Sequence, residues 1–293
     1  MKKLLNPRLM IIISMAVWGT MSIFVRNIAV SSSELALYRA VLASIMIGLY
    51  LLITKQEIPF HKIKKEIPFL IFSGIAMGFN WILLFEAYKH TTVSVATLSY
   101  YFAPVIVTLV CPILFKEKLT IKQLICFMMS TLGIILITGI GDVNGDNNLL
   151  GILFGLGAAV LYATVVLINK FIKNVDGIHR TLLQFLAAII ILIPYVLLTS
   201  GITINTLNTF GWLNLLIIGV IHTGIMYCIY FSSLKDVPGQ EAAILSYIDP
   251  LVAVFVSVTI LGESMTIMQI IGGIFILGFT LYNEIPTKKK HGN

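Results

Sequence analysis

Ten apolar runs follow one another along this chain, each near the roughly 20 residues that a helix needs to cross a bilayer. They are continuous rather than alternating, so they predict helices and not the strands of a β-barrel. With 58% hydrophobic and 11% charged residues, the chain cannot cover itself with a polar surface. We therefore predict an all-α membrane protein. The expected helices span about 9–28, 33–54, 66–89, 92–115, 120–139, 149–171, 178–200, 209–231, 239–262 and 266–284.

The basic residues predict the orientation of these helices. With the N-terminus in the cytoplasm, 17 of the 20 Lys and Arg residues fall at the inner ends, and only Arg26, Arg39 and Lys89 fall on the outer side. This bias favours both termini inside. The net charge of +7 is then a signal of topology and not of nucleic-acid binding. The first run lacks a small-residue cleavage site, so we expect it to remain as a helix and not to be a signal peptide.

The chain repeats itself. Shifting residues 91–125 by 146 positions pairs Tyr101 with Tyr247 and Pro104 with Pro250, and it pairs other identical residues without a gap. We predict a first repeat over 1–141, a connecting loop over 142–148 and a second repeat over 149–293. Five helices in each repeat is an odd number, so the second repeat is expected to be inverted relative to the first. The two prolines mark expected helix breaks, or hinges.

Several short motifs carry a resemblance to a known family. They are Trp18-Gly19, Tyr38-Arg39, Phe102-Ala103-Pro104, the run from Phe115 to Thr120 and its echo from Leu261 to Thr266. With the order of the ten segments, they resemble the EamA-type members of the drug/metabolite transporter superfamily. The resemblance implies a multi-pass carrier of the bacterial inner membrane with a central cavity, whose members export amino acids or other metabolites or take up nutrients.

Aromatic residues recur in register between the repeats. Trp18 corresponds to Tyr162 at an offset of 144, and Trp81 corresponds to Tyr227 at 146, as Tyr101 does to Tyr247. A cavity lined by these rings would hold a ring or an organic cation, with about 0.5–2 kcal/mol for each well-placed cation–π contact. Ordinary helix packing is the alternative, because packing would be repeated too.

Four polar residues lack a counterpart in the other repeat. Asp249 aligns with Ala103, His222 with Ala76, Asn80 with Met226 and Arg39 with Gln184. A charge near the bilayer centre costs about 2.5–3.5 kcal/mol, so it normally faces a cavity or a partner.

Each of these four residues has a functional and a structural interpretation. Asp249 is predicted to bind a substrate amine or a proton, or to form a structural pair with Arg39 or His222. His222 would join a proton relay or bond a neighbouring carbonyl. Arg39 would anchor a carboxylate or extend its charge outward. Asn80 would orient a polar head group or join two helices.

We predict a secondary carrier that works by alternating access around Pro104 and Pro250, with Gly78 and Gly224 allowing close packing. The expected cargo is a small amphipathic amine or amino acid moving outward, with protons as the candidate coupling ion. Uptake of choline or another quaternary ammonium is the alternative, and choline needs no cationic anchor such as Arg39. A remote alternative is an intramembrane enzyme, because residues 139–142 read Gly-Ile-Gly-Asp.

No cofactor, metal or oligomerising motif is evident in the sequence. Cys111, Cys126 and Cys228 lie inside predicted helices, where cysteine behaves as a small apolar residue. We therefore expect no cofactor, no metal site and a monomeric carrier whose partners are a small-molecule substrate and the lipid bilayer.

Overall fold

The regular structure of the chain is helical wherever it is described. A computed structural model describes residues 6–58, 60–115, 120–138, 146–175, 177–234, 236–237, 242 and 245–285, and these contain no strand. The first repeat holds α1 (Pro7–Gly19), α2 (Met21–Val25), α3 (Ser32–Ile53), α4 (Phe60–Ile63), α5 (Ile67–His90), α6 (Val93–Tyr100), α7 (Ala103–Phe115) and α8 (Ile121–Thr138). The second holds α9 (Asp146–Asn169), α10 (Gly177–Thr199), η1 (Ile204–Thr206), α11 (Thr209–Leu216), η2 (Ile217–Ile225), α12 (Met226–Leu234), α14 (Ile248–Thr259) and α15 (Ile267–Glu284).

Seven helical stretches in the described residues are long and apolar enough to cross a membrane. Three shorter apolar helices, over Ile121–Ile137, Ile248–Thr259 and Ile267–Asn283, fall in the remaining predicted segments. The prediction of an all-α, multi-pass membrane protein is confirmed. Ten crossings and an inverted repeat remain predictions.

Two helix interruptions lie just before the repeated prolines. In the first repeat α6 ends at Tyr100 and α7 begins at Ala103, so Tyr101 and Phe102 separate them. In the second repeat the chain turns at residues 246–247 before α14 begins at Ile248. Proline suits the first turn of a helix, where its missing N–H has no intrahelical partner. Each proline therefore restarts a helix, and the tyrosine three residues earlier stands at the interruption.

Two departures from regular helix were not predicted. Thr20 separates α1 from α2, and its hydroxyl donates to the carbonyl oxygen of Val17 at 2.7 Å. In the span over Thr209–Leu234, the nine residues of η2 form a π-helix. A π segment widens the helix and shifts the side chains that follow it, and such segments are frequent at functional sites.

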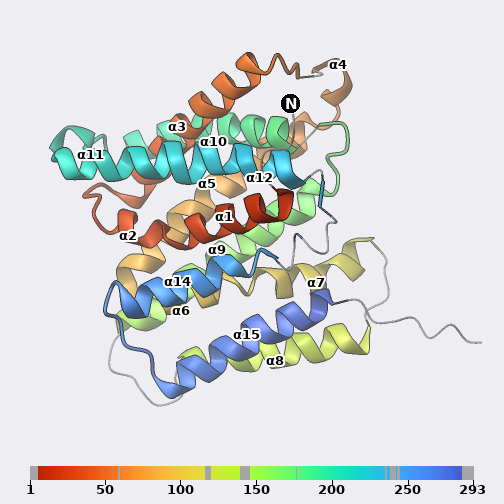
Figure 1. The fold of residues 1–293 in the computed structure, drawn as a ribbon, viewed down its shortest axis with the longest axis vertical. Helices are drawn as coiled ribbons and strands as arrows, with labels where there is room; N and C mark the ends of the chain where they lie inside the picture. The colour runs from red at the N-terminus through yellow and green to blue at the C-terminus, as the bar shows by residue number, and fades with distance from the viewer. Residues whose placement is uncertain are drawn as a thin grey trace, which may run out of the picture.

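The two repeats are interleaved. Helix α1 packs against α12 and α14 of the second repeat, while α9 packs against α5, α6 and α7 of the first. Figure 1 shows α3, α5, α10, α11 and α12 on one side of α1 and α9, and α6, α7, α8, α14 and α15 on the other. Each group therefore mixes helices from both repeats.

Helices α8 and α15 form a closely packed pair at the edge of the second group, as Figure 1 shows. A Cβ atom on Gly133 would lie 2.7 Å from the carbonyl oxygen of Gly272, and one on Gly272 would lie 2.6 Å from that of Gly133. Glycine at both positions lets the two backbones touch.

Three glutamates bind loops at the ends of the helices. Glu34, fully buried, accepts from the backbone N–H of Thr203 at 2.6 Å, and Glu66 accepts from the N–H groups of Lys173 and Asn174. Glu263 accepts from the N–H of Val93, the hydroxyl of Ser257 and the guanidinium of Arg26. Because Glu66 precedes α5 and Val93 follows it, Glu66 and Glu263 mark opposite ends of the molecule.

Candidate functional site

Asp249 lies in the first turn of α14, beside the interruption at residues 246–247. It is half-buried, and one carboxylate oxygen accepts a hydrogen bond from the hydroxyl of Tyr101 at 2.7 Å. The two interruptions are thus joined by one bond. A Cβ atom on Gly19 would lie 2.6 Å from the carbonyl oxygen of Asp249, so glycine at this position brings α1 against the site.

Tyrosines from three further helices lie in the neighbourhood of the Asp249 carboxylate. Tyr88 of α5, Tyr100 of α6 and Tyr162 of α9 all lie within electrostatic range of it. The rings of Tyr100 and Tyr162 have centroids 5.4 Å apart. Tyr162 keeps 42% of its surface exposed, so this ring is not sealed by helix packing.

Arg39 brings the opposite charge to the same cluster. Only 4% of the residue is exposed, and its guanidinium carbon lies 4.4 Å from the centroid of the Trp81 ring. The side chain therefore points into the bundle, and the interpretation that it extends outward is wrong. Arg39 and Asp249 lie within electrostatic range of each other, yet no ion pair joins these two described residues. A direct structural pair between them is absent.

The guanidinium of Arg39 is held by the π segment. Its Nε donates to the hydroxyl oxygen of Thr223 at 2.8 Å, and that hydroxyl donates to the carbonyl oxygen of Ile218, five residues earlier, at 2.9 Å. Among the described residues, neither Nη nitrogen donates a hydrogen bond. Guanidinium binds carboxylates through paired N–H groups in a fixed fork. The arrangement therefore fixes the orientation of the guanidinium and leaves its Nη donors free.

We define the charged cluster by its two charges and the hydroxyls around them. Its members are Arg39, Tyr88, Tyr100, Tyr101, Tyr162, Tyr227 and Asp249.

His222 does not contact Asp249. Nδ1 of its ring lies 3.3 Å from the carbonyl oxygen of Ile217, and Nε2 lies 3.1 Å from the hydroxyl oxygen of Thr20. The backbone carbonyl of His222 accepts from the indole of Trp18. These bonds tie the π segment to the interruption between α1 and α2. The interpretation of His222 as a residue bonded to a neighbouring carbonyl fits this geometry, and the relay does not.

Trp81 and Tyr227 do not face each other across open space. The Phe185 ring lies between them, with centroids 5.2 Å from Trp81 and 5.4 Å from Tyr227. Tyr227 also packs against Trp18, at 5.0 Å. The repeated aromatics thus form a chain of ring contacts in which Trp81 supports Arg39, while Tyr227 lies within electrostatic range of both charges.

Two other predicted site residues are buried. Asn80 donates to the carbonyl oxygen of Ala158 at 2.6 Å, which joins α5 to α9. Tyr247 lies at the interruption before α14, two residues from Asp249. Gly224 lies against α3, where a Cβ would meet the Met46 side chain at 2.6 Å, and Gly78 lies against Leu192. Gly139 to Asp142, the basis of the enzyme alternative, lie outside the described residues.

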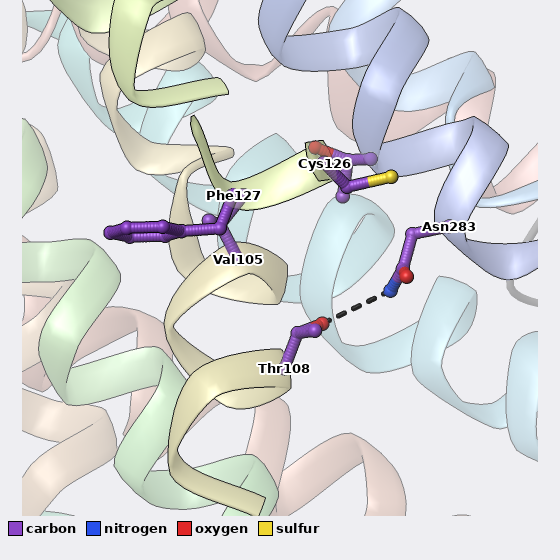
Figure 2. A pocket seen from close by; sticks show the side chains of 6 residues that line it. Val105, Thr108, Cys126, Phe127 and Asn283 are labelled. Atoms are coloured by element: carbon purple, nitrogen blue, oxygen red, sulfur yellow. Dashed lines mark hydrogen bonds between the residues drawn. The ribbon is translucent and has the colours of Figure 1, made fainter. Parts of the chain in front are cut away.

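Two cavities differ greatly in size. The smaller, shown in Figure 2 between α7, α8 and α15, has a volume of about 10 Å³, at the lower limit for one water molecule. There Asn283 donates to the hydroxyl of Thr108 at 3.1 Å. The larger, which we call the end cavity, measures about 260 Å³ and lies at the Glu263 end of the molecule. Its lining includes Arg26 and Lys89 at the surface and Phe85 and Tyr88 toward the charged cluster.

The sequence analysis missed several residues of the site. Tyr88, Tyr100 and Phe185 have no aromatic counterpart at the repeat offset, so a search for repeated rings passes over them. Thr223 is an ordinary residue in an apolar run until the π segment turns it toward Arg39. A search for aromatic residues near the prolines would have found Tyr100, which lies four residues before Pro104.

Comparisons with known proteins agree with this architecture. The profile of the EamA-like transporter family matches residues 7–139 and again 149–283. The uncharacterized transporter YxxF of Bacillus subtilis is 29% identical over 267 residues, which cover 90% of this chain and 85% of that protein. An uncharacterized transporter of Archaeoglobus fulgidus is 26% identical, with 92% and 93% covered. A solved crystal structure superposes with a TM-score of 0.64 at 15% identity over 94% of this chain and 95% of its own, which shows similarity of fold.

Proposed function

Because the chain belongs to the EamA-like transporter family, we propose that it carries a small zwitterionic amino acid with an apolar side chain out of the bacterial cell. The protein is a multi-pass membrane transporter and not an enzyme. The substrate of such a transporter is expected to carry charges complementary to those of Asp249 and Arg39 in the charged cluster.

The absence of an ion pair between Asp249 and Arg39 carries this proposal. Two opposite charges that lie within electrostatic range would gain from direct contact, because buried charges are normally paired. Here Tyr101 holds the carboxylate and Thr223 holds the guanidinium, each from its own side. A zwitterion would match both charges, with its ammonium group toward Asp249 and its carboxylate toward the free Nη nitrogens of Arg39. The aromatic rings would take its apolar side chain.

The same observation favours an amino acid over choline. A quaternary ammonium needs only aromatic faces and at most one anion, and a buried cation such as Arg39 would repel it. An amino acid uses both charges. Uptake of choline is therefore the weaker candidate, and a decarboxylated amine falls between the two because it engages Asp249 alone.

We propose alternating access between the two mixed groups of helices rather than between the sequence repeats. Rocking of residues 1–141 against 149–293 as rigid bodies would break the packing of α10 on α3 and α5 and of α14 on α6. Movement of α3, α5, α10 and α12 against α6, α7, α14 and α15 would instead separate Arg39 from Asp249. The interruptions before Pro104 and Pro250 supply the hinges.

We propose that Asp249 exchanges the substrate ammonium for a proton. A carboxylate that is never left bare avoids the cost of an unpaired charge inside the bilayer, about 2.5–3.5 kcal/mol. Inward movement of a proton and outward movement of the amino acid would then alternate at one group. A proton gradient should drive the transport, and Asp249→Asn should abolish the coupling.

The basic residues support an orientation with both termini in the cytoplasm and the Glu263 end facing outward. A reporter fused after Asn293 should respond in the cytoplasm, and one inserted at Asn147 should respond on the other side of the inner membrane. Responses of both reporters from the same side would contradict the ten-helix inverted topology.

A transport screen in proteoliposomes tests the substrate class. Apolar amino acids, their decarboxylated amines, polyamines and choline are compared under an imposed proton gradient. We expect the amino acids to be transported fastest and each decarboxylated amine about tenfold less efficiently, because it loses charge-assisted hydrogen bonds to Arg39. Preference for choline over every amino acid would overturn the proposal.

A further inference from the structure

The end cavity lies between the α2–α3 connection and α5, at the same end as Glu263. Its volume of about 260 Å³ is some 26 times that of the small cavity between α7, α8 and α15, which measures about 10 Å³. Pockets for drug-sized ligands measure about 300–1,000 Å³. The end cavity therefore suits a ligand somewhat smaller than these.

The lining of the end cavity is amphipathic. Apolar side chains, among them Val25, Ile28 and Leu35, form most of its wall, and its two charged groups, Arg26 and Lys89, are both cations. An apolar wall with cations at one place matches a molecule that has an apolar body and one carboxylate.

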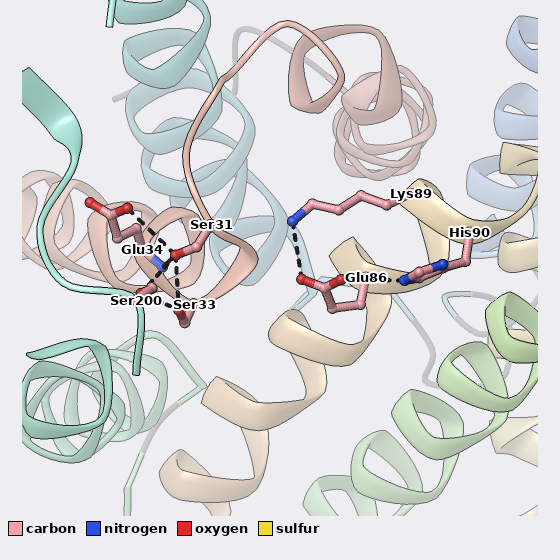
Figure 3. A network of polar contacts seen from close by, with 7 residues as sticks. All are labelled: Ser31, Ser33, Glu34, Glu86, Lys89, His90 and Ser200. Carbon is pink, nitrogen blue, oxygen red and sulfur yellow. Dashed lines mark hydrogen bonds and ion pairs between the residues drawn. The ribbon is translucent and has the colours of Figure 1, made fainter. Parts of the chain in front are cut away.

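Both cations keep donors available for such a carboxylate. Arg26 donates through Nη2 to Glu263 and retains other N–H groups, and its side chain is 34% exposed. Lys89 binds Glu86 at 3.0 Å through one of three donors. Figure 3 shows Lys89 extending from α5 over Glu86, with His90 on the other side of that carboxylate.

The inner wall of the end cavity is also part of the charged cluster. Phe85 lines the cavity, and its ring centroid lies 5.9 Å from the guanidinium carbon of Arg39. Tyr88 lines the cavity as well, and it lies within electrostatic range of Asp249 and Arg39. The side chains of Phe85 and Tyr88 thus separate the charged cluster from the end cavity. A molecule that displaces them would pass from the cluster into the cavity.

We propose that the end cavity is a second binding site for an amphipathic carboxylate, with Arg26 and Lys89 as its cationic ligands. The inference rests on the proposed function, because the amino acid would bind at this second site after it leaves Arg39 on its way out of the cell. Glu263 remains bonded to Val93 and Ser257 when Arg26 turns toward the ligand, so the helix ends stay joined.

The binding of isovalerate to the purified full-length protein tests this site. Isovalerate has the carboxylate and apolar body of a branched amino acid but no ammonium group for Asp249. It is titrated by NMR into the wild type, into Arg39→Gln, and into Arg39→Gln combined with Lys89→Gln or Arg26→Gln. Because Arg26 also bonds Glu263, Arg26→Lys is included to keep the charge, and Lys64→Ala at the opposite end is the matched control.

We expect Arg39→Gln to retain isovalerate binding, and each further Gln substitution to weaken it about tenfold, as for the loss of one charge-assisted hydrogen bond. Arg26→Lys and Lys64→Ala should bind as their parent does. Absence of binding in the wild type, or loss with Arg39→Gln alone, would overturn the second site. Failure of the proposed function would appear separately, as failure of amino acids to be transported in the screen.

Discussion

The two repeats share one helix break but fill it differently. In the first repeat the residue before the proline is Ala103, buried against Ala159 and Ala163. In the second it is Asp249, half-buried and bonded to Tyr101 from the first break. The same contrast separates α5, a regular helix, from its counterpart over Thr209–Leu234, which carries the π segment.

The difference shows where the two copies of a duplicated scaffold diverge. Two of these asymmetries face the charged cluster: the Asp249 carboxylate replaces a methyl group, and the π segment presents Thr223 to Arg39. Regular packing can be repeated, but a zwitterion has two unlike ends. A site for it has to break the symmetry of the fold around it.

Asp249→Asn should have the largest effect. It removes the charge proposed to bind the ammonium group, so transport should fall by about 100-fold, the upper range for a hydrogen bond to a charged group. The amount of inserted protein should stay near normal, because removing an intramembrane charge eases insertion. Glu57→Gln, at an exposed position, is the control. The measurements are the transport kinetics and the amount of protein inserted in the membrane. Unchanged kinetics across the pH range would make Asp249 a structural residue.

Exchanging the residues that precede the two prolines, Ala103 and Asp249, tests whether the two helix interruptions are equivalent. Ala103→Asp in an Asp249→Ala background should not restore transport, because it places the charge among small apolar side chains without a described partner. Recovery of transport would show that the two breaks are equivalent and that the contrast drawn here has no functional meaning.

Arg39→Gln should affect amino acids and spare amines. Loss of charge-assisted hydrogen bonds to a carboxylate costs about 1.5–3 kcal/mol, which raises the KM for the amino acid roughly 10- to 150-fold. The decarboxylated amine should retain its KM. Equal losses for both substrates would mean that Arg39 supports the fold and not the carboxylate. The ratio of the two KM values is the measurement.

The aromatic contacts should have intermediate effects. Trp81→Ala and Tyr227→Ala should each raise KM by about 2- to 30-fold, corresponding to 0.5–2 kcal/mol. Because Phe185 contacts both rings, their effects should be coupled, and the double variant should depart from the sum of the single losses. Phe at either position should be milder than Ala. Trp212→Ala, at a 40% exposed ring, controls for general loss of bulk. Unchanged KM with lowered melting temperature would assign both rings to packing.

Thr223→Val should give the smallest effect and the most selective one. It removes the acceptor for Nε of Arg39 while keeping the side-chain volume, so the guanidinium fork is no longer fixed. Because the guanidinium keeps its charge and its Nη donors, the cost should stay near that of a typical hydrogen bond, about 0.5–1.5 kcal/mol, and the KM for the amino acid should rise roughly 2- to 12-fold. Thr223→Ser, which retains the hydroxyl, should behave as the wild type. An equal rise for the decarboxylated amine would contradict a positioning role.

The sequence predicted those features that depend on the residues of one segment alone. Long apolar runs predicted the helices, and the repeated prolines predicted where two of them are interrupted. Unpaired charges in apolar runs pointed to Asp249 and Arg39, because such charges are costly. Their hydrogen-bond partners were not predictable, since Tyr101 and Thr223 lie 148 and 184 residues away from them and only packing brings them together.

The π segment and the glutamates that bind loops were also missed, for different reasons. Gly219 and Gly224 within the π segment are common in membrane helices and do not by themselves predict i−5 bonding. Glu34 had a usable local signal, because Ser31 and Glu34 are spaced as in a capping box. Glu66 and Glu263 bind loops that follow other helices, which no local pattern reveals.

The interleaving of the repeats has a consequence for how the chain is made. The ribosome delivers Arg39 to the membrane 184 residues before Thr223, and at about 5–20 residues per second the partner follows about 10–40 s later. During that interval the first repeat holds the Arg39 guanidinium without the Thr223 hydroxyl, and the surface that α9 later covers is open. We therefore expect the first repeat to bind lipid head groups or an insertion factor during this interval. Synthesis of the second repeat would then displace these temporary partners.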